Sequence, residues 1–192
     1  MSEDEEFKSS TFMKKMPEDG DCFYNSIVNA FLLSNDDVRN YDQIISEKED
    51  DGIAALRRTV AMAITEEIYK QFKSFGEAGL YDYKFMSSID SLISLRKQIM
   101  LSGSDVGPRE SIWANEFEIE VVCNSLQICC LIYDTSSKNK FIKVGKPEDR
   151  FVIVCKTGDH YNLLYGKEED GMKRGIQSRR HLSRRALRKW KI

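Results

Sequence analysis

Residues 19–27 read DGDCFYNSI, a glycine turn that leads directly into an apolar-periodic segment. Apolar side chains recur at the spacing of one helix face, which predicts a helix from Cys22 to about Leu33. Cys22 then lies in the first helical turn, where free backbone N–H groups and the helix dipole favour a thiolate over a thiol. The same N–H groups can donate to an oxyanion of a substrate bound over the helix start.

The charged neighbours of Cys22 oppose this reactivity. The carboxylates of Asp19 and Asp21 raise the pKa of a nearby thiol, so a reactive thiolate here needs a partner cation, most often imidazolium. The alternative is a buried structural cysteine, with Asp21 serving only as the helix cap. Taken alone, the turn favours this alternative, because free cysteine is among the most buried residue types.

A second segment, residues 158–163 with the sequence GDHYNL, supplies the missing base. If a strand begins at His160, then His160 and Asn162 project from the same face because side chains alternate along a strand. The amide oxygen of Asn162 can accept a hydrogen bond from one ring nitrogen of His160 and leave the other nitrogen to face a thiol. This is the Cys-His-Asn arrangement of a thiol hydrolase, although a histidine at an edge-strand turn is also common.

The rest of the chain predicts helices first and strands later. Helical spacing predicts one long helix that is capped by Asp51 and ended by Gly76 and Gly79. Further predicted helices cover residues 88–100 and 112–126, and predicted strands cover 128–133, 141–144, 151–155 and 160–165. This order predicts an α+β domain with a central, mostly antiparallel sheet flanked by helices.

Composition narrows the setting of the protein. The 192 residues suit one domain, and the longest apolar run is too short to span a bilayer. The chain has an odd number of cysteines, five, of which two are adjacent, and its N-terminus is acidic. These features predict free thiols and a reducing, cytoplasmic compartment. No C-x-x-C spacing is present, so we expect no metal site and four core thiols besides Cys22.

Three segments together resemble the OTU (ovarian tumour) family of deubiquitinating cysteine proteases. Residues 19–27 resemble the family's cysteine signature, although many members carry asparagine at the position of Asp21, and residues 158–162 resemble its histidine motif. Between them, residues 112–119 (IWANEFEI) resemble the segment before the central strand. The resemblance covers about residues 16–165 and implies an OTU/papain-like cysteine protease fold, with a catalytic domain over 11–170 and a flexible acidic arm over 1–10.

The resemblance also implies the role of each site residue. Cys22 would be the nucleophile, His160 the general base and later acid, and Asn162 the residue that orients His160. Backbone amides of Asp19, Gly20, Asp21 and Cys22 would form the oxyanion hole. No metal or organic cofactor is implied.

Two aromatic residues, Trp113 and Tyr161, are candidates for the walls of a channel for the ubiquitin tail, which ends in two glycines. A role as core aromatics is the alternative for both.

The implied activity is a thiol isopeptidase that hydrolyses ubiquitin–lysine isopeptide bonds through a thioester acyl-enzyme. The alternatives are a catalytically weak ubiquitin-binding module, or the same chemistry on a ubiquitin-like modifier. A compact enzyme of this kind suits a viral or bacterial effector acting in host cytosol.

The C-terminal segment 171–192 has a different character. Residues 173–192 hold nine Lys or Arg and no acid, so residues 1–172 carry all 31 acidic side chains against 20 basic ones. Leu182, Ala186 and Trp190 recur every four residues, which predicts a basic amphipathic helix or tail. It either packs on the acidic domain or contacts an anionic membrane, a nucleic acid or another docking partner. His181 lies in this segment without an acidic neighbour, and we expect a surface position for it.

Overall fold

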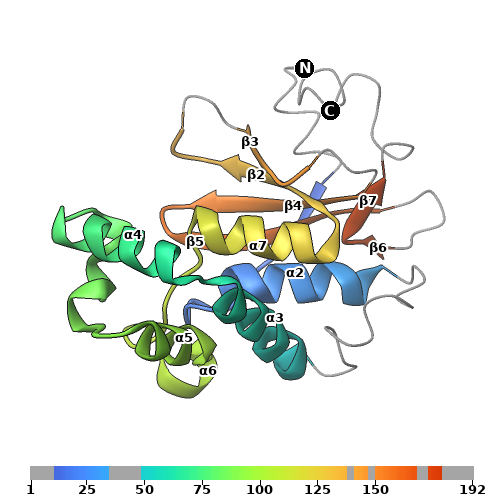
Figure 1. Ribbon diagram of the computed structural model, residues 1–192. Helices are drawn as coiled ribbons and strands as arrows, with labels where there is room; N and C mark the ends of the chain where they lie inside the picture. The colour runs from blue at the N-terminus through green and yellow to red at the C-terminus, as the bar shows by residue number, and fades with distance from the viewer. Residues whose placement is uncertain (1–10, 35–48, 138–140, 147–149, 168–172, 179–192) are drawn as a thin grey trace.

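The computed structural model describes residues 11–34, 49–137, 141–146, 150–167 and 173–178, and it shows one sheet with helices against it (Figure 1). The sheet has the order β1-β5-β4-β2-β3, with β6 paired to β5 and β7 paired to β4. Only β2 and β4 run parallel, so the sheet is mostly antiparallel. The strands are β1 (Thr11–Lys14), β2 (Cys129–Asp134), β3 (Phe141–Val144), β4 (Arg150–Thr157), β5 (His160–Lys167), β6 (Lys173–Arg174) and β7 (Ile176–Ser178).

The helices form the other layer. Helices α2 and α7 lie across the sheet, and the remaining helices lie farther from it (Figure 1). They are α2 (Cys22–Leu33), α3 (Glu49–Ala63), α4 (Glu66–Glu77), the 3-10 helix η1 (Tyr81–Ser88), α5 (Leu92–Met100), α6 (Gly103–Val106) and α7 (Glu116–Leu126). None of the helices in the described part of the chain is long and apolar enough to cross a bilayer. The predicted α+β class is confirmed.

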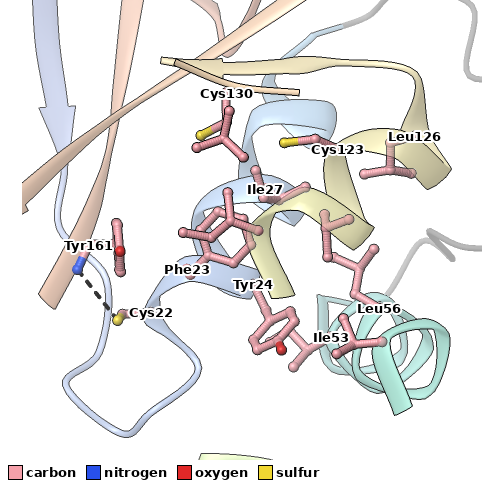
Figure 2. Close-up of a cluster of buried hydrophobic side chains, with 14 of the residues drawn as sticks. Cys22, Phe23, Tyr24, Ile27, Ile53, Leu56, Cys123, Leu126, Cys130 and Tyr161 are labelled. Atoms are coloured by element: carbon pink, nitrogen blue, oxygen red, sulfur yellow. Dashed lines mark hydrogen bonds between the residues drawn. The ribbon is translucent and has the colours of Figure 1, made fainter. Parts of the chain in front are cut away.

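Alternation along the strands divides the buried side chains between the two faces of the sheet. On one face, Cys130, Val152 and Leu163 join the main core with the helices. Figure 2 shows Phe23 and Ile27 of α2 within this core. Helix α2 begins beside the start of β5, so Cys22, the first residue of α2, lies in the core next to the first residues of β5.

Several predicted helix boundaries are wrong. Helix α3 begins at Glu49, before the predicted cap Asp51, and α7 begins at Glu116 rather than at residue 112, because Asn115 caps it. The predicted long helix is divided into α3 and α4, because the hydroxyl of Thr65 accepts a hydrogen bond from the N–H of Ile68 at 3.4 Å and caps a new helix. Likewise, the helix predicted to begin at residue 88 begins at Leu92, because Ser91 caps it.

The sheet also extends at both ends of the described chain. Strand β1 was not predicted, since Phe12 and Met13 are largely exposed and the strand buries little. Residues 173–178, which the sequence assigned to the basic tail, form β6 and β7 and pair with the sheet. The acidic arm 1–10 and the predicted amphipathic face at Leu182, Ala186 and Trp190 lie outside the described residues, as does His181.

Candidate active site

Cys22 is the first residue of α2 and is buried, with 2% of its surface exposed. Its sulfur accepts a hydrogen bond from the backbone N–H of Tyr161 at 3.4 Å (Figure 2). That N–H belongs to the peptide group that joins His160 to Tyr161. The structure therefore brings the helix start and the first residues of β5 together, although they are far apart in the sequence.

The environment of Cys22 favours a thiol at rest. Burial, with smaller contributions from the charges of Asp19 and Asp21, raises the pKa of Cys22 to about 11. The backbone N–H groups of Tyr161 and Phe23 act in the opposite direction but do not compensate for burial. The helix start alone therefore does not produce a thiolate, and proton transfer to a base must accompany attack.

His160 and Asn162 are joined as their alternation along β5 predicts. The Nε2 atom of His160 lies 3.2 Å from Oδ1 of Asn162. The same oxygen accepts the backbone N–H of Met16 at 2.8 Å, which fixes the orientation of the amide. Because Oδ1 can only accept, Nε2 must carry a proton.

The other ring nitrogen of His160 is available. Nδ1 is buried and has no hydrogen-bond partner among the described residues. With the proton on Nε2, Nδ1 of the neutral ring holds the lone pair that a general base needs. An unpaired buried nitrogen is costly in a packed core, and its place beside the peptide that contacts Cys22 makes His160 a candidate base for this thiol.

The amides that are predicted to donate to an oxyanion lie in the turn before Cys22, and one of them already has an acceptor. The N–H of Asp21 donates to Oδ1 of Asp19 at 2.9 Å. The backbone N–H of Cys22 has no partner in the described part of the chain. A substrate oxyanion could therefore take the Cys22 amide directly, and the Asp21 amide by displacing the Asp19 carboxylate.

A buried charge pair supports this turn, and the sequence pattern did not reveal it. Arg57 and Asp21 are both fully buried and form an ion pair at 2.5 Å. The available signal was a single cation on the apolar face of α3, between Ile53 and Val60. A helix face with one basic residue in its centre requires a buried acceptor elsewhere in the fold.

A cavity of about 450 Å³ lies beside the site. Both predicted channel residues, Trp113 and Tyr161, line it, together with Asp159, which precedes His160. Trp113 is half-buried, and its indole N–H donates to the carbonyl of Pro108 at 2.9 Å, so the ring is held in place. The cavity therefore adjoins the start of β5 through Asp159 and Tyr161, although Cys22, His160 and Asn162 are not among its lining residues.

Other candidates lie apart from this chemistry. Asp134 accepts hydrogen bonds from the N–H and hydroxyl of Ser136, which lower the pKa of its carboxyl. The four other cysteines are buried and are not joined in disulfides. Among the described residues, no group of three or more His, Cys, Asp or Glu side chains is arranged to hold a metal ion.

Comparison with known proteins identifies the fold. No family model and no curated protein matches the sequence. The structure is similar to an OTU domain solved in complex with ubiquitin, with 14% identity, 92% of this chain and 80% of that chain aligned, and a TM-score of 0.52. It is also similar to the OTU domain protease of Taggert virus (14% identity, 87% and 86% aligned, TM-score 0.48) and to an OTU deubiquitinase from Wolbachia pipientis wMel (12% identity, 93% and 95% aligned, TM-score 0.39). The assignment rests on the first of these, which has the highest TM-score of the three, and we conclude that the chain has the fold of an OTU domain.

Proposed function

We propose that this protein is a cysteine isopeptidase that releases ubiquitin from lysine side chains. The observation that carries the proposal is the junction of Cys22 with the first residues of β5, where His160 holds an unpaired Nδ1 and Asn162 accepts from Nε2. A structural cysteine would need neither an oriented imidazole nor an unpaired ring nitrogen.

The chemistry begins with the transfer of the Cys22 thiol proton to Nδ1 of His160. The thiolate attacks the carbonyl carbon of the C-terminal glycine of ubiquitin, and the carbonyl oxygen becomes an oxyanion held by backbone amides of the turn. The C–N bond then breaks, and the imidazolium donates its proton to the departing lysine amine. Water, deprotonated by His160, cleaves the thioester, which yields the glycine carboxylate and returns the thiol.

Ubiquitin as the substrate is supported by the fold and by charge. The similar OTU domain was solved in complex with ubiquitin. Residues 1–172 of this chain carry a large acidic excess, which suits the basic face and the arginine-containing tail of ubiquitin. The cavity lined by Trp113 and Tyr161 offers a place for that tail beside Cys22.

The test is covalent capture by a ubiquitin probe that carries a C-terminal electrophile. We expect the full chain to form a stable adduct, the Cys22→Ala variant to form none, and the Cys123→Ala variant, which changes a buried cysteine of α7, to react like the wild type. Non-covalent binding without capture would instead indicate a ubiquitin-binding module. Capture by a probe made from a ubiquitin-like modifier, and not by the ubiquitin probe, would move the same chemistry to that substrate.

A further inference from the structure

Arg57 is the most completely hydrogen-bonded side chain near the site. It lies on α3, is fully buried, and finds an acceptor for each N–H of its guanidinium. Nε donates to Oδ1 of Asp21, while Nη1 and Nη2 donate to the carbonyl oxygens of Ile99 (2.9 Å), Gly20 (3.1 Å) and Ile112 (3.2 Å from each). The guanidinium therefore ties the turn before Cys22 to two other segments.

The Asp21 carboxylate is satisfied as fully as the guanidinium. Its Oδ1 faces Arg57, and its Oδ2 accepts from the hydroxyl of Ser102 at 2.6 Å and from the N–H of Ser104 at 3.2 Å. Asp21 therefore does not cap α2 with its side chain, although it occupies the N-cap position. The carboxylate is used to bind Arg57 and α6 instead.

Stability alone is a weak explanation for this pair. Burying two charges costs solvation energy that their attraction often fails to exceed, and apolar residues of similar volume can be equally stable. The geometry of the pair suggests a more specific role, because Arg57 also binds the carbonyl of Gly20 in the turn that supplies the oxyanion donors.

The bond to the Gly20 carbonyl determines which way the next amide points. In a trans peptide the C=O and N–H groups point in opposite directions. With its carbonyl directed into the core toward Arg57, the Gly20–Asp21 peptide directs its N–H outward to the half-buried Asp19, whose carboxylate accepts it. This N–H belongs to the residue directly before Cys22, in the stretch whose amides are predicted to donate to an oxyanion formed at that sulfur.

Without Arg57, little would hold the Gly20–Asp21 peptide in this orientation. Gly20 has a φ of 96°, a region that glycine enters freely, so the turn itself does little to prevent rotation of the peptide. A rotated peptide would present a carbonyl oxygen, rather than an N–H, to the developing oxyanion. The carbonyl oxygen of the rotated peptide and the oxyanion would then repel each other.

We propose that Arg57 is a positioning residue that holds the Gly20–Asp21 peptide with its N–H toward the oxyanion formed at Cys22. The final step of this inference rests on the proposed thiol hydrolase function, because it assigns the oriented amide to an oxyanion. Asp19 then occupies, in the free protein, the place that the oxyanion takes during the reaction.

The test compares the double variant Arg57→Met/Asp21→Asn with Asp21→Asn alone. Both lack the carboxylate, so the difference between them reports the guanidinium, which in Asp21→Asn keeps its backbone carbonyl acceptors but has no counter-charge. Arg58→Met, an exposed neighbour on the same helix, is the matched control and should hydrolyse a fluorogenic ubiquitin amide like the wild type. Relative to Asp21→Asn, we expect the double variant to lose roughly 100-fold in kcat, the typical effect of one lost oxyanion donor, with KM changed less than about threefold.

Two further readouts separate positioning from a general structural role. Alkylation of Cys22 by iodoacetamide needs no oxyanion hole and should proceed at a similar rate in both variants. The crystal structure of the double variant should show the Gly20–Asp21 peptide rotated. Arg57→Lys keeps the positive charge but cannot reach all four acceptors, so it should show the same loss in kcat. This variant replaces the double variant in the test if the double variant does not fold.

Equal kcat in the two variants would overturn the inference, and so would a double variant whose peptide keeps its orientation. A parallel loss of kcat and alkylation would indicate a disordered site and would also overturn it. A wild-type protein that hydrolyses no ubiquitin amide would refute the proposed function, whereas the orientation of the peptide in the variant structures would still decide the role of Arg57.

Discussion

The protonation state of Cys22 in the free protein is the most direct physical prediction. Burial raises the pKa of this thiol from 9.0 to about 11, against the effect of the N–H groups of Tyr161 and Phe23. A thiol with that pKa is about one part in a thousand thiolate at pH 8, since each pH unit below the pKa lowers the fraction about tenfold. We therefore expect Cys22 to rest as a thiol, and to ionise only as His160 accepts its proton.

The assay is the rate of alkylation by iodoacetamide between pH 6 and pH 10, followed by intact mass, with Cys22→Ala as the background. The logarithm of the rate should rise steadily with pH and show no plateau near neutrality. Circular dichroism at each pH confirms that the protein is folded. A plateau that begins below pH 8 would refute the reasoning, because it would show a thiolate–imidazolium pair already present in the free protein.

Three other outcomes follow from contacts around the site. Asn162→Ala should lower kcat by roughly tenfold to a hundredfold, less than His160→Ala, because it frees the His160 ring to change tautomer without removing the base. Asn162→Asp keeps the hydrogen-bond acceptor and should retain most activity. Hydrolysis of a ubiquitin amide measures these effects, and full activity of His160→Ala would exclude the mechanism. Burial raises the pKa of Glu118 from 4.5 to about 7, so the folded protein loses stability as the pH rises between these values. Glu118→Gln should remove that loss and be up to about 3 kcal/mol more stable than the wild type at pH 8, but not at pH 4.5. Urea denaturation at the two pH values measures this, and a stability difference that does not depend on pH would contradict burial as the cause. Gly103→Ala should lower the Tm by several degrees, because an added Cβ would stand 1.8 Å from the carbonyl oxygen of Asp19, and an unchanged Tm would show that the turn can move aside.

Local patterns predicted most of the regular structure. The helix at Cys22–Leu33 and the strands β2 to β5 follow from apolar periodicity and β-branched runs, and the structure confirms them. The division between α3 and α4 was missed, since the apolar stripe continues through Ile64 while Thr65 caps a new helix. Strand β1 was missed because its stability comes from pairing with β5 rather than from its own burial.

The candidate site was predictable to a similar extent. The two motifs and their resemblance to the OTU family predicted Cys22, His160 and Asn162, and the structure brings Cys22 to the start of β5 and joins His160 to Asn162. The place of Arg57 on the apolar face of α3 indicates only that it needs a buried partner, since its acceptors come from three separate segments of the chain.

The sequence by itself determined which side chains are candidates for nucleophile, base and orienting residue, because side-chain identity and short spacing decide which groups could act in these roles. Only the tertiary structure decided the electrostatic state of those groups. Burial raises the pKa of Cys22, the Met16 amide and Asn162 set the tautomer of His160, and Arg57 neutralises Asp21 within the core. Desolvation and hydrogen bonding depend on which distant segments meet, and no local pattern in the chain encodes that meeting.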